Sequence, residues 1–455
     1  NTDAIDNSGG VDCSDHEVNI KILLNSSLLN GSLSKSDRNK LLEKMTSNVA
    51  SLVLRNNYLQ SQALTVELAG SRTKADAHAR LMRDLERSGH LDREVEFLPN
   101  EELMTERLQS GNTLTRPELA ILLASAKINV FSELIDSDIS EDNYLAEDLH
   151  FYFPEAIQSS HSDSVFIHPL RKEIIATSVA NSMINRAGCS FVNEMVKLTK
   201  RPVSEISRAY AAARHVFCLR ELWLEIESLD NKVDSKLQTE MLIEVGRLLE
   251  HGTVWFLKTK GNKIDISEII EEFADGVATL GEVIEDVLSP EQLVKVHRAR
   301  SKLLEKGVPE GISTMIAAVD PLLSACDIVE ISREIKIDVS KAAKAYFSIG
   351  SEFYIDWIRD SASELSLGSH WKHQAVDAIH NDLFIQQRSL CLSVLRTFNH
   401  SNSVETAILD YRKSNKNIIN PTFEVLEDLK AYEKFDLAML TVANAQIRSL
   451  IFDKS

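Results

Sequence analysis

The stretch Asn7-Ser-Gly-Gly-Val-Asp-Cys-Ser-Asp-His-Glu17 places two adjacent glycines directly before a helix start. Ser14 and Glu17 have the Ser-x-x-Glu spacing of a capping box, and Val18 and Ile22 follow at helical spacing. A glycine turn that leads into a helix can present backbone N–H groups to an anion. The stretch therefore predicts a tight turn, a helix and an anion-binding backbone near the beginning of the chain.

The composition of the remaining chain favours helices over sheet. Among 455 residues, 16 are glycine and 9 are proline, which is about half the combined share of an average protein. Few helix breakers permit long uninterrupted helices, and a hydrophobic share of 44% is enough to fill a large core. We expect an all-α fold with one large multi-helix domain.

Charge and cysteine usage exclude several classes of partner and site. The net charge of -18 repels nucleic acid and anionic lipid surfaces, so neither is expected as a partner. The sequence has no apolar run of the length that a membrane span needs. The five cysteines are widely separated and include no Cys-x-x-Cys pair, so we expect no disulfide framework or zinc site and a cytoplasmic location.

The polar segment 25–36 indicates a loop, and it predicts a domain border near Asn30 that separates residues 1–30 from residues 31–455. Residues 157–165 are predicted to form a second loop. Roughly fourteen to eighteen helices are expected. Helix-forming patterns cover 37–68 (capped by Ser34), 75–88, a segment capped by Thr115 and Glu118, 169–188, 203–228, 236–257, a segment from Ser289 to Gly307, 321–334, 340–360, 371–399, 404–414 and parts of 425–452.

Several motifs resemble the carboxyl-terminal region of the large bacterial NAD-specific glutamate dehydrogenase family. The first is the opening turn, where related dehydrogenases carry Asn-Ala-Gly-Gly-Val-x-x-Ser. The others are Arg55-Asn-Asn-Tyr-Leu-Gln-Ser-Gln-Ala-Leu64, Leu114-Thr-Arg-Pro-Glu-Leu-Ala-Ile-Leu-Leu-Ala124, His168-Pro-Leu-Arg-Lys-Glu-Ile-Ile-Ala-Thr177, and Arg247-Leu-Leu with Trp255-Phe-Leu257. The resemblance is specific up to about residue 260 and diffuse beyond it.

The resemblance implies a fold and an activity. Residues 1–30 would be a short remnant, a turn and a helix, of a Rossmann-type nucleotide-binding domain, and residues 31–455 a helical C-terminal domain. The chain holds no Gly-x-Gly-x-x-Gly, so we expect it to be a fragment. The dinucleotide fingerprint and the family's catalytic Lys and Asp are expected upstream, no residue here is assigned as catalytic, and the fragment is expected to be inactive alone.

The resemblance also implies a reaction and partners. The full-length enzyme would convert L-glutamate, NAD and water to 2-oxoglutarate, ammonia and NADH, with NAD bound mainly by the upstream catalytic domain. The helical region would brace, assemble or regulate that domain, and a homo-oligomer is expected. The alternative is an independent helical scaffold that docks partners without catalysis.

The same resemblance assigns site residues in the opening turn. Asn7, Gly9 and Gly10 would contact the cofactor, and Val11 and Ser14 would contact glutamate. An Asn amide can donate to and accept from a carboxamide, and a Ser hydroxyl at a helix start can donate to a carboxylate. The competing interpretation is that Ser14 only caps its helix and Asn7 only forms a turn.

Other candidate sites have simpler explanations. Cys13, His16 and Glu17 share a helix face, but ordinary helix surface is favoured over metal binding. A metal-dependent hydrolase using His370, His373 and Asp377 is a third, weaker hypothesis. Core packing is favoured for Trp223, Trp255, Trp357 and Trp371, and ion pairs with Glu221, Glu225 and Glu250 are expected for Arg214, Arg220, Arg247 and Lys258.

Overall fold

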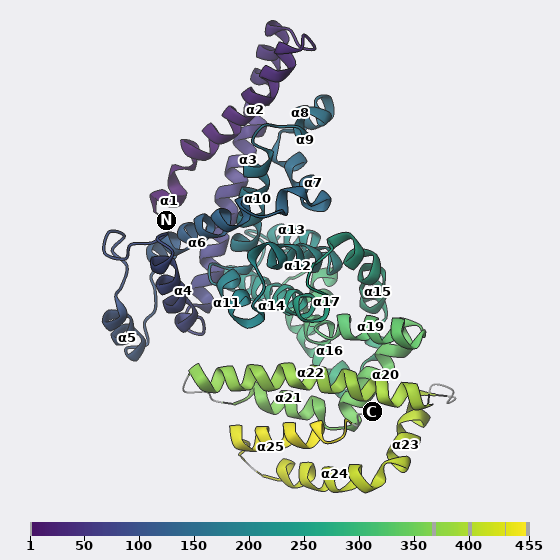
Figure 1. The fold of residues 1–455 in the computed structure, drawn as a ribbon. Coiled ribbons are helices and arrows are strands. Elements are labelled where there is room, and N and C mark those ends of the chain that lie inside the picture. The colour runs from purple at the N-terminus through teal and green to yellow at the C-terminus, as the bar shows by residue number, and fades with distance from the viewer. Residues whose placement is uncertain (1, 366–369, 399–402, 433, 452–455) are drawn as a thin grey trace. The chain divides into compact units, whose positions relative to one another are not determined.

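The structure is a computed structural model that describes residues 2–365, 370–398, 403–432 and 434–451. Throughout these residues the regular structure is helical, and no strand is present (Figure 1). The all-α expectation is therefore confirmed. None of the helices in the described part of the chain is long and apolar enough to cross a membrane.

The chain divides into two compact units. The first unit contains residues 1–227 and 235–270, and the second contains residues 228–234 and 271–455. The helices of the first unit are α1 (Asp3–Asp6), η1 (Asn7–Gly9), α2 (Val11–Leu29), α3 (Lys35–Gly70), α4 (Ala75–Arg87), α5 (Glu101–Gln109), α6 (Arg116–Ile135), η2 (Ile139–Glu141), α7 (Asn143–Tyr152), α8 (Glu155–Ser160), α9 (Ser162–Phe166), α10 (Arg171–Ala187), α11 (Phe191–Thr199), α12 (Val203–Val216), α13 (Leu219–Glu227) and α14 (Ser235–Thr259).

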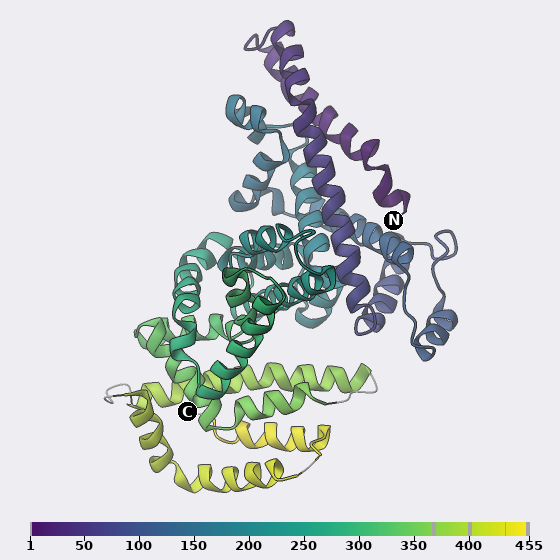
Figure 2. The same ribbon diagram turned by 180° about the vertical axis from the view of Figure 1, so that it is seen from behind.

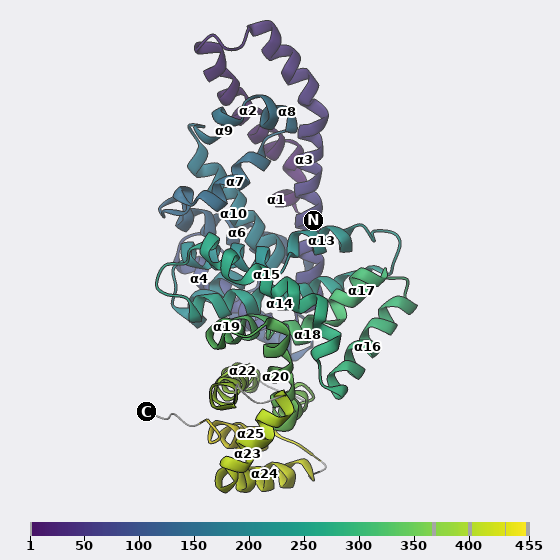
Figure 3. The same cartoon turned by 90° about the vertical axis from the view of Figure 1, so that its right-hand side faces the viewer.

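Helices α2 and α3 form a helical hairpin joined by residues 30–34 (Figures 1 and 3). Helix α3 also packs on α6, α10 and α14, which form the centre of the first unit. The Ser34 hydroxyl accepts a hydrogen bond from the Asp37 backbone N–H, and Thr115 and Glu118 form the predicted capping box of α6. Local capping patterns thus fix where these two long helices begin.

The second unit continues from α15 (Ile266–Val287), whose first residues belong to the first unit. Its long helix α22 packs on both α21 and α25, which also pack on each other, and α24 packs on α25 (Figures 1 and 2). The remaining bounds are α16 (Pro290–Glu305), α17 (Glu310–Ala317), α18 (Val319–Leu322), α19 (Ala325–Ile335), α20 (Val339–Glu352), α21 (Ile355–Ser363), α22 (His370–Phe398), α23 (Val404–Ser414), α24 (Lys416–Lys430) and α25 (Leu437–Arg448).

Several predicted elements are wrong, and two of them are wrong because the chain bends at residues that are not glycine or proline. The single helix expected over 203–228 is two helices, since Cys218 has a φ of 51°. Tyr354, with a φ of 61°, likewise separates α20 from α21. The loop expected over 157–165 lies within the short helices α8 and α9, and segment 321–334 divides between α18 and α19. The described residues therefore contain twenty-five α-helices, more than predicted.

Candidate functional site

The opening turn presents the five predicted cofactor and substrate residues to solvent. Asn7 and Gly9 lie in η1, Gly10 precedes α2, and all of them, with Val11 and Ser14, are exposed. The Gly10 N–H donates to the Asn7 carbonyl at 3.1 Å, and a Cβ on Gly10 would lie 2.9 Å from the Asn7 Oδ1. Gly10 therefore allows the close approach of the Asn7 side chain, and the contact roles of the five residues stay predictions.

The predicted capping role of Ser14 is wrong. Helix α2 begins at Val11, so Gly10 is its N-cap and Ser14 lies inside the helix, where its side chain is exposed. Serine can cap only from the residue before the first helical one. The helix starts earlier because η1 leads directly into it. The hydroxyl of Ser14 is thus free to face another part of the protein.

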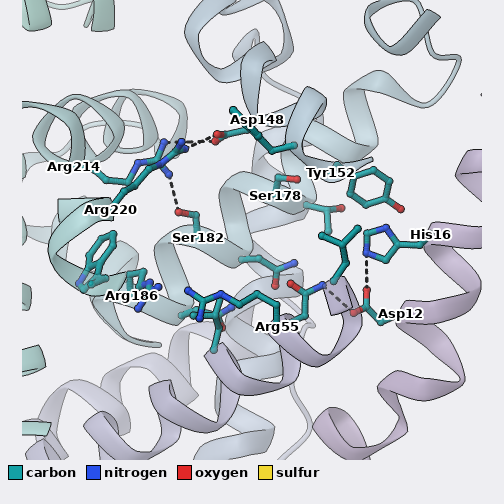
Figure 4. Close-up of a pocket in the computed structure, with 18 of the residues that line it drawn as sticks. Asp12, His16, Arg55, Asp148, Tyr152, Ser178, Ser182, Arg186, Arg214 and Arg220 are labelled. Atoms are coloured by element: carbon teal, nitrogen blue, oxygen red, sulfur yellow. Dashed lines mark hydrogen bonds and ion pairs between the residues drawn. The ribbon is translucent and has the colours of Figure 1, made fainter. Parts of the chain in front are cut away.

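Helix α2 also borders a cavity of about 620 Å³ (Figure 4). Six helices of the first unit form its walls, and most of its lining side chains are polar or charged. The lining residues are Asp12, Asp15 and His16 from α2, Leu52, Arg55, Asn56 and Leu59 from α3, Asp148, Phe151 and Tyr152 from α7, Thr177, Ser178, Asn181, Ser182, Asn185 and Arg186 from α10, Arg214 from α12, and Arg220, Trp223 and Leu224 from α13.

One end of this cavity is basic. The Asp148 carboxylate lies 3.6 Å from Arg214 and 2.5 Å from Arg220, and Arg214 donates to the Ser182 hydroxyl at 3.0 Å. The bend at Cys218 separates α12 from α13, and the two arginines come from either side of it. Asp148 is a shared partner that the sequence analysis missed, because it is 72 residues from Arg220.

A second pair of arginines shares another buried carboxylate. Arg55 and Arg186 lie 2.7 Å and 2.8 Å from opposite oxygens of Glu227. The Arg186 guanidinium also lies 4.5 Å from the ring centroid of Trp223, an arrangement that favours cation–π attraction. Trp223 is buried as predicted, whereas Trp371 is 79% exposed, so core packing was the wrong expectation for Trp371.

The α2 end of the cavity is acidic. The Asn56 amide donates to Asp12 at 2.9 Å, and the Tyr152 hydroxyl donates to Asp15 at 2.7 Å. The His16 ring stacks on Tyr152 with 4.4 Å between centroids. Burial lowers the pKa of His16 and outweighs the nearby Asp12 and Asp15 carboxylates, so the buried ring is neutral near pH 7.

The metal candidates predicted from sequence are not brought together. His16 lines the cavity, whereas Cys13 and Glu17 line a separate hollow between α2 and α3. On α22, His373 and Asp377 are exposed, and the side chain of His370 lies outside the described residues. In the part of the chain that the structure describes, one group with metal-ligating atoms does cluster, namely Glu67, His78 and Cys189.

That cluster has the donor types of a zinc site but fits an ion-pair network better. Glu67 lies 2.9 Å from the His78 Nε2 and 3.3 Å from the Lys74 ammonium, and it accepts from the Cys189 backbone N–H at 3.1 Å. Burial raises the pKa of the Cys189 thiol well above its ordinary value, whereas a metal ligand must be a thiolate. The Lys74 ammonium already supplies the positive charge that a cation would bring.

Two family profiles match this chain in succession. The profile described as "Bacterial NAD-glutamate dehydrogenase, catalytic domain" matches residues 1–67, and "Glutamate dehydrogenase, C-terminal" matches residues 111–449. The chain belongs to the bacterial NAD-specific glutamate dehydrogenase family. It represents the carboxyl-terminal region of that family, as the motif resemblance predicted.

The curated relatives carry the name NAD-specific glutamate dehydrogenase. The protein of Pseudomonas aeruginosa is 35% identical over 450 residues, that of Halomonas elongata 37% over 395 residues, and that of Mycobacterium tuberculosis 30% over 453 residues. These alignments cover 99%, 87% and 99% of this chain and 28%, 24% and 28% of the respective relatives. The chain therefore spans about a quarter of the length of the relatives it matches.

Residues 1–67 and 111–449, the two matched regions, meet in the first unit along a polar seam. The His168 Nε2 lies 3.0 Å from the Asn19 carbonyl oxygen, and both side chains are buried. Further side-chain hydrogen bonds cross this seam. Five of them are Asn19 to Tyr152, Tyr152 to Asp15, Lys127 to Gln60, Arg116 to the Ser61 carbonyl, and Arg186 to Gln62.

Proposed function

We propose that the whole protein is an NAD-dependent glutamate dehydrogenase. Its reaction would convert L-glutamate, NAD and water to 2-oxoglutarate, ammonia and NADH. This chain would contribute the end of the catalytic domain and a helical region that braces it. The catalytic Lys and Asp, and most of the NAD site, are assigned to upstream sequence, and the region is proposed to be inactive alone.

The hydrogen bonds across the seam between the two matched regions support the proposed bracing role. Buried polar groups are costly unless they are hydrogen-bonded, so Asn19 and His168 hold each other in one arrangement. Helix α2 is therefore bound to the helical region through Asp15 and Asn19, while the side chains of Val11 and Ser14 stay exposed. A fixed α2 would hold the opening turn in position for catalysis.

The exposed turn supports the residue roles that the resemblance assigns. We propose that Asn7, Gly9 and Gly10 contact the cofactor and that Val11 and Ser14 contact the glutamate side chain. Val11 is 65% exposed, so its side chain is accessible to a ligand or to another part of the protein. We also propose that the whole protein forms a homo-oligomer in a reducing cytoplasm, and its subunit mass in solution tests the first part.

The decisive experiment measures NADH formation by the purified full-length protein with NAD and a panel of amino acids. We expect turnover with L-glutamate, formation of one 2-oxoglutarate per NADH, and little activity with NADP. A scaffold without catalysis, the alternative function, would bind partners but give no amino-acid-dependent NADH. Absence of turnover with every amino acid would contradict the proposed enzyme.

A further inference from the structure

The basic end of the cavity holds more positive than negative charge. Arg214 and Arg220 share Asp148, and Arg55 and Arg186 share Glu227, so four guanidinium groups pair with two carboxylates. Asp12 lies at the α2 end, apart from Arg214 and Arg220 (Figure 4), and Asp15 of the same helix accepts a hydrogen bond from Tyr152. The uncompensated positive charge therefore comes from arginines of α3, α10, α12 and α13.

Arg214 is a buried group with unused hydrogen-bonding capacity. Its side chain is 4% exposed, its Nε atom has no hydrogen-bond partner, and its Nη2 atom faces the Asp148 carboxylate at 3.6 Å, beyond hydrogen-bond distance. The Oδ1 of Asn185, another residue that lines the cavity, is also unpartnered. Buried N–H groups are costly when unpaired, and guanidinium groups bind carboxylates and phosphates through charge-assisted hydrogen bonds.

The shape of the cavity limits the size and charge of its ligand. A volume of about 620 Å³ accommodates a small metabolite, and Trp223 provides an apolar wall beside Arg186. The Asp12 and Asp15 carboxylates at the far end would repel a second anionic group. A fitting ligand thus carries one anionic group at one end and a neutral or cationic remainder.

We infer that this cavity is a binding site for a small metabolite with a single phosphate or carboxylate group. The anionic group lies against Arg214 and Arg220, with Ser178 and Ser182 of α10 beside it. The site is distinct from the exposed turn, because none of Asn7, Gly9, Gly10, Val11 and Ser14 lines the cavity. Binding does not depend on the proposed dehydrogenase activity.

Equilibrium dialysis of the full-length protein with labelled inorganic phosphate at low ionic strength tests this inference. Arg220→Gln removes one guanidinium whose side chain is 43% exposed, so folding should be preserved, and phosphate affinity should fall about tenfold. Arg83→Gln is the matched control, because Arg83 is also 43% exposed and paired with one carboxylate, Glu101, but lies outside the cavity.

Ser178→Glu provides a second, independent variant. Ser178 is half-buried in the cavity wall, so a glutamate there places a carboxylate near the anion and should abolish phosphate binding. If acetate displaces the labelled phosphate, the site also binds carboxylates. If acetate does not displace it, the natural ligand carries a phosphate group. Absence of phosphate and acetate binding, or equal affinity in wild type, Arg220→Gln and Ser178→Glu, would overturn the inference.

Discussion

Gly188 shows how one residue links a backbone conformation to a buried charge. It follows the end of α10 with a φ of 101°, a conformation that side chains rarely adopt. A Cβ at this position would collide with the Glu67 carboxylate, which accepts a hydrogen bond from the next residue, Cys189. Glycine is therefore required at position 188 both by the positive φ and by the lack of space for a Cβ.

Gly188→Ala should therefore lower the free energy of unfolding by at least about 2 kcal/mol, since it adds a collision to backbone strain. Thermal unfolding of the full-length protein measures this change. Gly89→Ala is the matched control, because Gly89 has a φ of 77° but open space around its Cα. If both variants lose the same stability, the contact with Glu67 has no energetic importance.

The variant Ser14→Ala distinguishes a role of Ser14 in binding substrate from a role in helix stability. Because Ser14 is exposed inside α2 and does not cap it, Ser14→Ala should change stability by less than about 0.5 kcal/mol. If its hydroxyl contacts glutamate, the KM for glutamate should rise about tenfold. Ser26→Ala, another exposed serine of the same helix, should leave KM unchanged. An unaltered KM in Ser14→Ala would contradict the proposed substrate contact.

At the scale of elements, Glu67 connects α3 to α4 and to the junction of α10 and α11. Burial alone would raise the pKa of Glu67, but the Lys74 ammonium and the His78 hydrogen bond outweigh burial and hold the pKa at about 2. The ionised carboxylate thus binds three partners inside the first unit. A lowered carboxylate pKa makes stability depend on pH.

The pH dependence has a definite sign. The ordinary pKa of a glutamate is 4.5, so the stabilisation is present above that pH and is lost as the pH falls toward about 2. Glu67→Gln should remove up to about 3 kcal/mol at neutral pH and flatten the decline of stability below about pH 4.5. Urea unfolding at several pH values measures both effects.

Glu43→Gln, at an exposed position on the same helix, is the control for this titration. It should retain the wild-type decline of stability with acid. If Glu67→Gln instead declines as steeply as wild type, the Glu67 carboxylate is not among the groups that set acid stability. Because glutamine is neutral, Glu67→Gln also leaves the Lys74 ammonium without its buried counter-charge. A loss of stability at neutral pH alone therefore does not show that protonation of Glu67 causes the decline in acid.

At the scale of the whole molecule, the seam predicts that the helical region affects turnover at a distance. His168→Phe removes the hydrogen bond to the Asn19 carbonyl, and the one that Nδ1 accepts from the Leu170 N–H, but preserves an aromatic ring beside Phe153, whose centroid lies 5.6 Å away. Looser attachment of α2 should lower kcat for glutamate by roughly twofold to tenfold, because positioning of the opening turn, which is proposed to contact cofactor and glutamate, is impaired.

Steady-state NADH formation by the full-length enzyme checks this bracing role. His161→Phe is the control, since the ring nitrogen of His161 hydrogen-bonds only the neighbouring Ser160 among the described contacts. Wild-type kcat in His168→Phe, with a normal thermal midpoint, would argue that the seam has no part in catalysis.

Local sequence patterns were sufficient for the fold class and for many helix boundaries. The capping boxes at Thr115 and Ser289 form as predicted, and the helix predicted over 404–414 has those bounds. These features depend on hydrogen bonds between residues three or four apart, which a sequence displays directly. The family motifs also indicated the correct family before any contact was known.

The tertiary structure alone decided the features that depend on distant residues. Cys218 and Tyr354 bend the chain in the left-handed region without glycine, which packing imposes and a local pattern does not display. Arg220 meets Asp148 across 72 residues, and Glu67 meets Cys189 across 122. Burial and charge pairing are properties of folded surfaces, so the cavity and the seam exist only once α2, α3, α7, α10, α12 and α13 are packed together.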